Sequence, residues 1–598
     1  MVPPKTDCSH HDYGFSQAPR GFSANLVYGS SFEKGTQNVP GWTPFASGAA
    51  SSAQPPELAD SCSFNAKSSM SFTLPSGGGE LGLRNRGIGG AGLFLEGGKP
   101  YSVSLFVWSG NSPTAFVELF DFTTNTSLAR QDFKVISTGP DWGSTWIRYN
   151  FTLTPVSGTT CVGIPFGSDP TIDCGNDAGP AHVCVRCGGE LRVGISDGDN
   201  FKVGYVELLP GPWGLLSDKR GNPLPILKSG ADILTSMGVT LMRNGGSVSQ
   251  SIRWKDWRGA VWNRPSQQQF WGNSLLSGFG PFEYIEMAEA LDIEPIITLA
   301  YDTNDATDWA DLVEYLYGDQ TTSWGKRRSA DRGHPDPYNI RVFELGNEQY
   351  NDNFLSQIAA MEARSQAVNG PAIHYMFPQN SGLNAADAAK VVATLPADII
   401  PRIMPDLHVG AGGAVEEAKS LFANPPVPGF NQSAINCETN AATHDLERAL
   451  NEAADLIDWF NVDDATASRL YGRTASFCTG SSNNFDTWDQ GIAFFLRAWS
   501  TYVVTRNVVL FSLSTSPPTT PTPFNSTSQH DVAPTPWLCP HDDLEYVGRD
   551  DGPSGGRTVS VCGNAQRRRE ISPSPRGEHL RWILALQCHA HGRCGVRN

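Results

Sequence analysis

Two glutamates, Glu348 and Glu438, each follow a short apolar run, and their side chains could perform acid–base and nucleophilic chemistry. A carboxylic acid at the end of a strand can donate a proton to a leaving group, and a carboxylate can attack as a nucleophile. Taken singly, Glu348 also fits a surface residue after a Gly-Asn turn, and Glu438 fits a carboxylate at a helix N-terminus. As a pair they predict the two carboxylates of a retaining glycoside hydrolase, which lie roughly 5–5.5 Å apart.

The segments around these glutamates alternate between helical and strand patterns. Apolar residues recur at helical spacing in three segments and as short β-type runs in three others. The helical segments are 228–238, 282–291 and 306–317, and the strands are 239–243, 294–299 and 341–345. Such alternation predicts βα units around a parallel sheet. The two glutamates lie 90 residues apart (438 − 348 = 90), which leaves room for about three units. We therefore expect a (β/α)8 barrel over residues 213–497, with both glutamates at strand ends.

Residues 22–210 have a different pattern. Segments 101–108, 115–120 and 146–153 alternate apolar and polar residues, and clusters of Gly, Pro, Ser and Asp separate them. Many short strands without helical periodicity predict an antiparallel β-sandwich. Such sandwiches often bind glycans, but most do not, so binding stays open.

Composition restricts the partners and the cellular setting. A formal net charge of −17 argues against nucleic acid or an anionic membrane surface, whereas a neutral polysaccharide is compatible with it. The sequence has no run of about 20 apolar residues that could span a membrane. Twelve cysteines and the glycosylation sequons at Asn125, Asn150, Asn431 and Asn525 favour a secreted protein, although the N-terminus lacks the apolar region of a signal peptide.

Four cysteines are clustered in a loop-rich part of the sandwich region, namely Cys161, Cys174, Cys184 and Cys187. The Cys184-Val-Arg-Cys187 spacing could suggest zinc, but no second pair follows at the spacing of a zinc finger. We predict local disulfides of undetermined pairing, no metal and no cofactor.

Both ends of the sequence lack a clear pattern. We expect residues 1–21 to be irregular. Residues 498–598 are rich in Ser, Thr, Pro, Arg and Gly without periodicity, which predicts a disordered or mis-spliced tail that the fold does not need.

Four stretches match motifs of one known family. They are Leu241-Met-Arg-Asn-Gly-Gly-Ser-Val-Ser249 with Trp254-Lys-Asp-Trp257, Phe343-Glu-Leu-Gly-Asn-Glu348, Pro405-Asp-Leu-His408 and Ile435-Asn-Cys-Glu438. Over about residues 22–497 the chain resembles glycoside hydrolase family 51, the α-L-arabinofuranosidases. The form it resembles is the plant-like one, which has an inserted sandwich similar to a carbohydrate-binding module.

The resemblance implies a role for each matching residue. Glu348 would be the acid/base and Glu438 the nucleophile. Asn347 would bind the sugar next to the scissile bond, Arg243 would steady the region of the nucleophile, and His408 matches the family's His-X-Tyr segment. The implied activity is removal of α-L-arabinofuranosyl groups from plant or algal cell-wall polysaccharides such as arabinoxylan or arabinan.

Three departures from the family pattern leave alternatives open. Gly410 replaces the family's Tyr, the first barrel strand with its sugar-binding Glu is missing, and nothing after residue 497 resembles the family's C-terminal β-domain. The barrel is therefore expected to be incomplete. An endoglucanase or β-xylosidase would use the same glutamates, and a carbohydrate-binding protein with an inactive barrel is the remaining alternative. The oligomeric state is left open.

Overall fold

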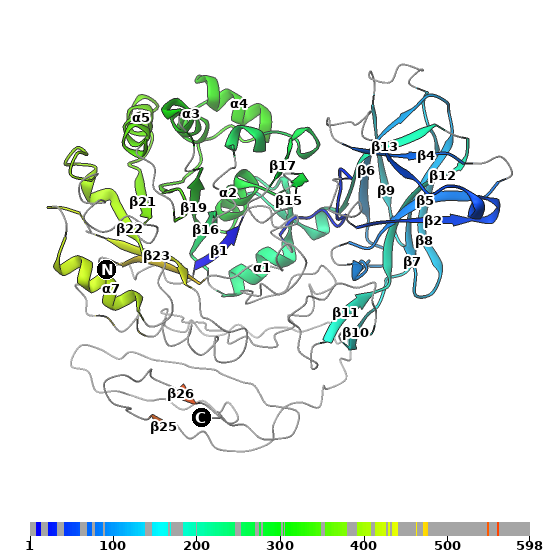
Figure 1. Cartoon of the computed structure of the whole chain (residues 1–598), viewed down its shortest axis with the longest axis horizontal. Coiled ribbons are helices and arrows are strands. Elements are labelled where there is room, and N and C mark those ends of the chain that lie inside the picture. Colours follow the sequence, from blue (N-terminus) through cyan, green and yellow to red (C-terminus); the bar gives the residue numbers. More distant parts are fainter. Residues whose placement is uncertain are drawn as a thin grey trace.

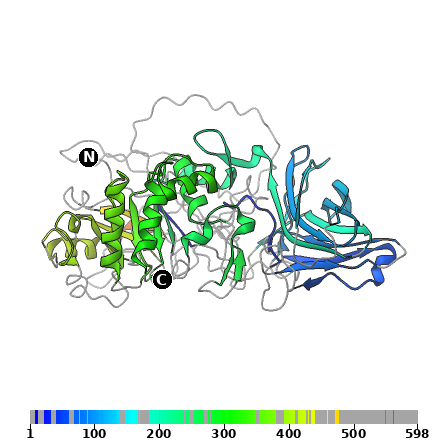
Figure 2. The ribbon, with the colours of Figure 1, turned by 90° about the horizontal axis from the view of Figure 1, so that it is seen from above.

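The computed structural model consists of a barrel and a β-sandwich that lie side by side (Figures 1 and 2). The residues that the structure describes are 8–12, 22–32, 41–59, 68–74, 78–87, 90–137, 146–165, 168, 183–198, 200–237, 239–245, 253–268, 274–276, 279–300, 303, 305–348, 353–378, 392–407, 413–425, 428–430, 433–439, 458, 462, 470–475, 547–548 and 559–560. The predicted C-terminal tail lies outside them, apart from the two-residue strands β25 (Val547–Gly548) and β26 (Val559–Ser560).

Eight strands form a closed barrel in which neighbouring strands run parallel. In spatial order they are β1 (Cys8–Asp12), β16 (Leu241–Gly245), β19 (Glu294–Leu299), β20 (Val342–Leu345), β21 (His374–Pro378), β22 (Ile403–Asp406), β23 (Ala434–Thr439) and β24 (Leu470–Ala475). The sequence-based prediction of a parallel barrel after a sandwich is confirmed.

The prediction of an incomplete barrel was wrong. Strand β1 lies within the segment expected to be irregular, residues 1–21, and takes the place of the first barrel strand. Cys8 pairs with Leu241 on β16, and Ser9 pairs with Ala475 on β24. The sequence Cys-Ser-His-His-Asp has no β-branched residue and no Phe, Tyr or Trp, so only its two neighbours in the barrel define it as a strand.

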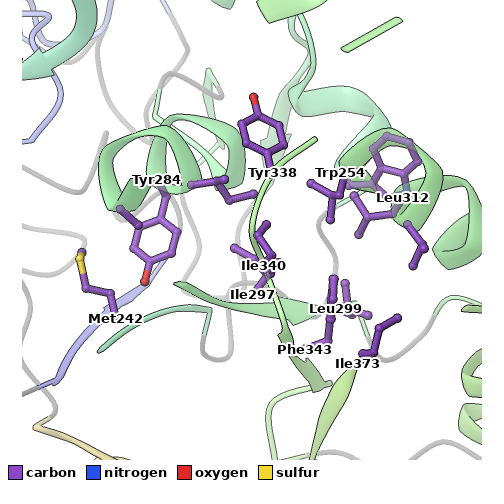
Figure 3. Packing of buried hydrophobic residues seen from close by; sticks show 14 of the residues in the cluster. Met242, Trp254, Tyr284, Ile297, Leu299, Leu312, Tyr338, Ile340, Phe343 and Ile373 are labelled. Atoms are coloured by element: carbon purple, nitrogen blue, oxygen red, sulfur yellow. The ribbon is translucent and has the colours of Figure 1, made fainter. Parts of the chain in front are cut away.

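Side chains of the barrel strands alternate between the interior and the surrounding helices, as the period of two in a strand requires. One apolar cluster lies inside the barrel, and a larger one lies between the strands and the helices. The interior cluster consists of Leu241, Ile296, Val342, Met376, Met404 and Ile435. In the outer cluster, Met242, Ile297 and Phe343 lie toward Tyr284 of α2 and Leu312 of α3 (Figure 3).

Six described helices accompany the strands. They are α1 (Lys228–Met237), α2 (Pro281–Ala290), α3 (Ala306–Tyr317), α4 (Ser323–Arg332), α5 (Phe354–Ala367) and α7 (Ala414–Ala423). Local signals define several ends: Asp305 accepts a hydrogen bond from the Thr307 amide at the start of α3, and Gly333 ends α4 with a φ of 63°. None of the helices in the described part has the length and apolar character to cross a membrane.

The sandwich consists of two five-stranded sheets with a shared apolar core. The first sheet has the order β2 (Trp42–Ser47), β5 (Glu80–Asn85), β12 (Gly189–Asp197), β7 (Thr114–Asp121), β8 (Thr126–Lys134). The second has the order β3 (Glu57–Ala59), β4 (Ser69–Phe72), β13 (Phe201–Pro210), β6 (Tyr101–Ser109), β9 (Ile147–Leu153). Three of these strands, β6, β7 and β9, match segments predicted from the sequence.

The sandwich is inserted between the first two strands of the barrel, β1 and β16. Its entering and leaving connections lie together: the Ala24 amide donates to the Pro225 carbonyl, and the Leu26 amide donates to the Leu208 carbonyl. The Asn25 carboxamide oxygen also accepts from the Leu208 amide. Two short hairpins lie on the barrel side of this junction, formed by β14 (Leu215–Ser217) with β15 (Pro223–Leu227) and by β17 (Ser266–Gln268) with β18 (Ser274–Leu276).

A disulfide joins Cys161 and Cys187, which pair across the hairpin of β10 (Cys161–Pro165) and β11 (Val183–Cys187). This bond confirms the prediction of a local disulfide for these two cysteines. Cys174 and the side chain of Cys184 lie outside the described residues. In the described parts of the chain, no group of three or more His, Cys, Asp or Glu side chains is arranged to hold a metal ion.

Candidate active site

A polar layer follows the apolar interior cluster toward the C-terminal ends of the strands. Arg243, Thr298 and Glu344 each come two residues after a member of that cluster, on β16, β19 and β20. Residues two apart on a strand point to the same side, so these three side chains lie above Leu241, Ile296 and Val342 inside the barrel. In barrels of this type the C-terminal strand ends carry the functional residues.

Arg243 and Glu344 form a bidentate ion pair across β19. The Arg243 Nε donates to Glu344 Oε2 at 2.6 Å, and Arg243 Nη2 donates to Glu344 Oε1. The Thr298 hydroxyl donates to the same Glu344 Oε2. Arg243 is 0% exposed and Glu344 is 1% exposed, so the pair is shielded from water on all sides. Two parallel charge-assisted hydrogen bonds fix the plane of the guanidinium group as well as its position.

Asn347 lies just after the end of β20 and is bound by the same arginine. Its side-chain oxygen Oδ1 accepts a hydrogen bond from Arg243 Nη2. Gly346, with a φ of 76°, lies directly before it in a bend that covers residues 346–348. Asn347 is 1% exposed and Arg243 is 0% exposed. A buried partner therefore holds the amide at the strand end.

Glu348 is partly exposed and has a φ of 51°, in the left-handed region. Most described non-glycine residues with positive φ are Asn or Asp, whose short side chains tolerate this conformation. A longer side chain in this region is uncommon, and such positions cluster at functional sites. The turn places Glu348 next to the buried Asn347 and at the boundary with solvent.

Glu438 lies in β23, and two strands, β21 and β22, separate β23 from β20. The pairing between β23 and β24 is irregular between Asn436 and Thr439, on either side of Glu438. Irregular pairing of this kind often occurs beside active sites, where it redirects a side chain. The side chain of Glu438 is not among the described parts, and His408 lies outside the described residues.

The described contacts of Arg243 add a partner that the sequence did not indicate, the carboxylate of Glu344. The expected role of Arg243 in steadying the region of the nucleophile stays a prediction, because the side chain of Glu438 is not among the described parts. Sequence reasoning missed Glu344, Thr298 and the buried Asp406 at the end of β22. The signal for Glu344 was present, because the period of two from Val342 directs it into the barrel, where a charged group needs a partner.

The fold and the strand-end residues define a parallel (β/α)8-barrel protein that carries a β-sandwich insert after its first strand. The sequence model of the "Alpha-L-arabinofuranosidase 1 domain" family matches residues 233–390, which include Arg243, Asn347 and Glu348. The extracellular exo-α-L-arabinofuranosidase of Streptomyces chartreusis is 26% identical over 385 residues, which cover 58% of this chain and 41% of that protein. The α-L-arabinofuranosidase A of Aspergillus kawachii is 28% identical over 244 residues, which cover 36% of each chain.

The chain thus spans only about two fifths of the length of these relatives. Among solved structures, the arabinose-bound α-L-arabinofuranosidase MgGH51 superposes with a TM-score of 0.60 at 17% identity, over 82% of this chain and 78% of that one. At this identity the match establishes the fold alone. Together with the sequence matches, it confirms the resemblance to glycoside hydrolase family 51.

Proposed function

We propose that the protein is a retaining glycoside hydrolase that removes non-reducing-end α-L-arabinofuranosyl residues from polysaccharides such as arabinoxylan or arabinan. The observation that carries the proposal is the end of β20, where the Arg243–Glu344 pair fixes Asn347 directly before Glu348. Glu438 on β23 supplies the second carboxylate. The relatives named above are arabinofuranosidases, which favours this sugar over glucose or xylose.

The proposed reaction is a double displacement. A carboxylate oxygen of Glu438 attacks the anomeric carbon while the bond to the leaving oxygen breaks. The leaving oxygen keeps the electron pair and takes the proton of Glu348. In the second step, the Glu348 carboxylate removes a proton from water, whose oxygen attacks the same carbon and releases Glu438. The anomeric carbon then carries a hydroxyl group in place of the leaving group, with the same configuration as in the substrate.

The other predicted residues bind the sugar in this proposal. Asn347 offers its amide to a hydroxyl of the sugar next to the scissile bond, and Arg243 orients that amide. His408 is assigned to the same region from the motif alone. No cofactor or metal takes part, since two carboxylates and water suffice for the reaction. Catalysis is assigned to β1 with residues 213–497, whereas the module-like sandwich of residues 22–210 is assigned no step.

We further propose that the protein acts outside the cell, on a plant or algal wall polysaccharide. The Streptomyces relative is named extracellular. The sequons at Asn125 and Asn150 lie on the sandwich with both asparagines exposed, where an oligosaccharide could be attached. The net charge of −17 fits a neutral polymer better than an anionic one.

The test is hydrolysis of aryl α-L-arabinofuranoside, β-D-xyloside and β-D-glucoside by the full chain, with the configuration of the first product followed by NMR. We expect turnover of the arabinofuranoside with retention. Preferred turnover of the xyloside or glucoside would identify one of the alternative hydrolases, and inverted product would exclude the nucleophile. If the chain binds arabinoxylan but hydrolyses none of the glycosides, the protein is a carbohydrate-binding protein instead. A missing first strand would not explain such inactivity, because β1 closes the barrel.

A further inference from the structure

Glu344 lies on the same strand as the proposed acid/base, yet no role in the reaction has been assigned to it. We propose that Glu344 is a positioning residue: it holds Arg243 so that the Asn347 amide presents its NH2 group to the sugar. The inference rests on the proposed function, because that function assigns Asn347 to the sugar beside the scissile bond.

The first step of the argument is the geometry of the guanidinium group. Both oxygens of Glu344 accept from one edge of Arg243, through Nε and Nη2. Nη2 also donates to Asn347 Oδ1. Because two parallel bonds fix the guanidinium plane, the Nη2–H bond that points to Asn347 has one direction only. Without Glu344, a side chain with four rotatable bonds would lose that restraint.

The second step concerns the amide. A guanidinium group has donors and no acceptor, so the Asn347 atom that faces it must be the oxygen. The nitrogen Nδ2, with two donor hydrogens, is then the end of the amide on the other side. Rotating the amide by 180° would place donors against donors and leave a buried group unsatisfied. Arg243 therefore selects which end of Asn347 can bind a sugar hydroxyl.

The third step is the burial of the pair. Arg243 and Glu344 are at most 1% exposed, and the Thr298 hydroxyl also donates to Glu344. A buried ion pair contributes little net stability compared with apolar residues of the same volume. Stability alone therefore does not explain a charged pair at this depth, whereas orientation of Asn347 does. The pair also cancels the charge of Arg243 next to the proposed reaction centre.

The test is a double-mutant cycle of kcat/KM on an aryl arabinofuranoside, with Glu344→Gln, Asn347→Ala and both together. Losing a hydrogen bond to a charged group costs about 1.5–3 kcal/mol, so we expect each single variant to be about 10- to 100-fold slower. If Glu344 acts through Asn347, the double variant should be no more than about twofold slower than Asn347→Ala. Independent effects would multiply, and that result would overturn the proposal.

A matched control separates positioning from stability. Glu362 on α5 forms a similar bidentate pair with Arg402, with distances of 2.6 and 2.8 Å, at the N-terminal end of β22. Glu362→Gln should lower the unfolding temperature and leave kcat/KM within about twofold. If it slows the reaction as much as Glu344→Gln, a general loss of packing explains both and the proposal fails.

A milder variant covers the case in which Glu344→Gln does not fold. Thr298→Val keeps the shape of the side chain and removes the hydroxyl that binds Glu344. We expect a loss of about 2- to 10-fold in kcat/KM, because this variant removes one of the bonds to Glu344 and keeps the ion pair with Arg243, again without further loss on top of Asn347→Ala. Additive losses in this cycle would also overturn the proposal. If the unmutated protein hydrolyses none of the glycosides, the proposed function itself fails, which is a different outcome from an active enzyme with an additive cycle.

Discussion

The guanidinium carbon of Arg148 lies 3.8 Å from the ring centre of Trp262, and this stacking joins the sandwich to the barrel. Arg148 belongs to β9, whereas Trp262 belongs to the short 3-10 helix Val261–Asn263, in the connection that follows barrel strand β16. Phe106 and Tyr205 of the sandwich surround the same indole ring at 5.9 and 6.3 Å. Connections after barrel strands lie on the side of the C-terminal strand ends, so the sandwich contacts the barrel on the side of the candidate site.

Trp262→Ala should uncouple the two parts. The variant loses the contacts with both aromatic rings and a cation–π interaction of about 0.5–1 kcal/mol. We expect differential scanning calorimetry to show one transition for the unmutated protein and two for the variant. Phe133→Ala is the control, since Phe133 contacts only Tyr149 and Phe151 of the sandwich among the ring pairs described. If both variants keep a single transition, other contacts couple the two parts.

The proposed roles of the two glutamates predict different mutant phenotypes. Glu348→Ala removes the proton donor, so natural linkages should react about 10²–10⁴-fold more slowly. A dinitrophenyl arabinofuranoside needs little protonation and should still form the covalent intermediate, and azide should accelerate its turnover. Glu438→Ala removes the nucleophile and should abolish turnover of every substrate. Steady-state rates with and without azide measure both effects.

Equal losses in both variants on activated and natural substrates, without azide rescue, would refute this division of roles. The same outcome would leave the fold and the Arg243–Glu344 pair unaffected, because neither glutamate belongs to that pair.

The lowered pKa of Glu283 leads us to predict how the stability of the protein depends on pH. Burial in α2 would raise the pKa of Glu283, but Arg264 and Arg332 overcome this effect and hold it at about 2. The lowered pKa stabilises the fold above the ordinary value of 4.5, and this stabilisation is lost as the pH falls from 4.5 toward 2. Its size is about 3 kcal/mol at neutral pH.

Urea unfolding at several pH values between 7 and 2.5 checks this expectation. Glu283→Gln should lower stability at neutral pH and flatten the decrease in acid. Asp232→Asn is the control, because its partner Lys228 and Asp232 itself are more than half exposed, and it should change neither quantity measurably. If the free energy of unfolding of Glu283→Gln falls with decreasing pH as steeply as that of the wild type, other carboxylates cause the acid sensitivity.

The Cys161–Cys187 disulfide closes a loop with a sequence separation of 26 residues. The chain-entropy model gives about 3–4 kcal/mol for a loop of this length. We expect Cys161→Ser/Cys187→Ser to lower the midpoint of unfolding, and reduction of the wild type to give the same midpoint. Peptide mapping without reduction should recover the two cysteines in one cross-linked fragment. A different partner for either cysteine in that map would contradict the assigned bond.

The sequence predicted those parts of the fold whose signal is local. Strand β20 was recognisable because apolar residues lead to a Gly-Asn turn, and α3 because its apolar residues recur at helical spacing. Strand β1 was missed because five residues without an apolar pattern become a strand only through partners at Leu241 and Ala475. These partners are more than 200 residues away along the sequence, so the pairing of β1 depends on closure of the whole barrel.

The candidate site was predicted to a similar extent. Motifs pointed to Arg243, Asn347 and Glu348, and the structure brings Arg243 and Asn347 into contact. The partner of Arg243 was not predicted. Which carboxylate faces an arginine in a barrel depends on the register of strands that are about 100 residues apart, and no local pattern records that register.

The insertion of the sandwich also has a consequence during protein synthesis. Cys8 leaves the ribosome 233 residues before its partner Leu241 (241 − 8 = 233), and at about 5–20 residues per second β1 stays unpaired for roughly 10–50 s. The sandwich is complete at Pro210, 31 residues before Leu241 (241 − 210 = 31), which leaves about 2–6 s for it to fold before β16 is made. Once folded, it holds residues 22–32 beside the chain that is about to form β16, through contacts such as Ser23 with Ile226. Pairing of β1 with β16 then no longer requires closure of a long flexible loop, because the folded sandwich already holds the two ends of its own chain together. The barrel therefore begins to form with its first two strands close to each other.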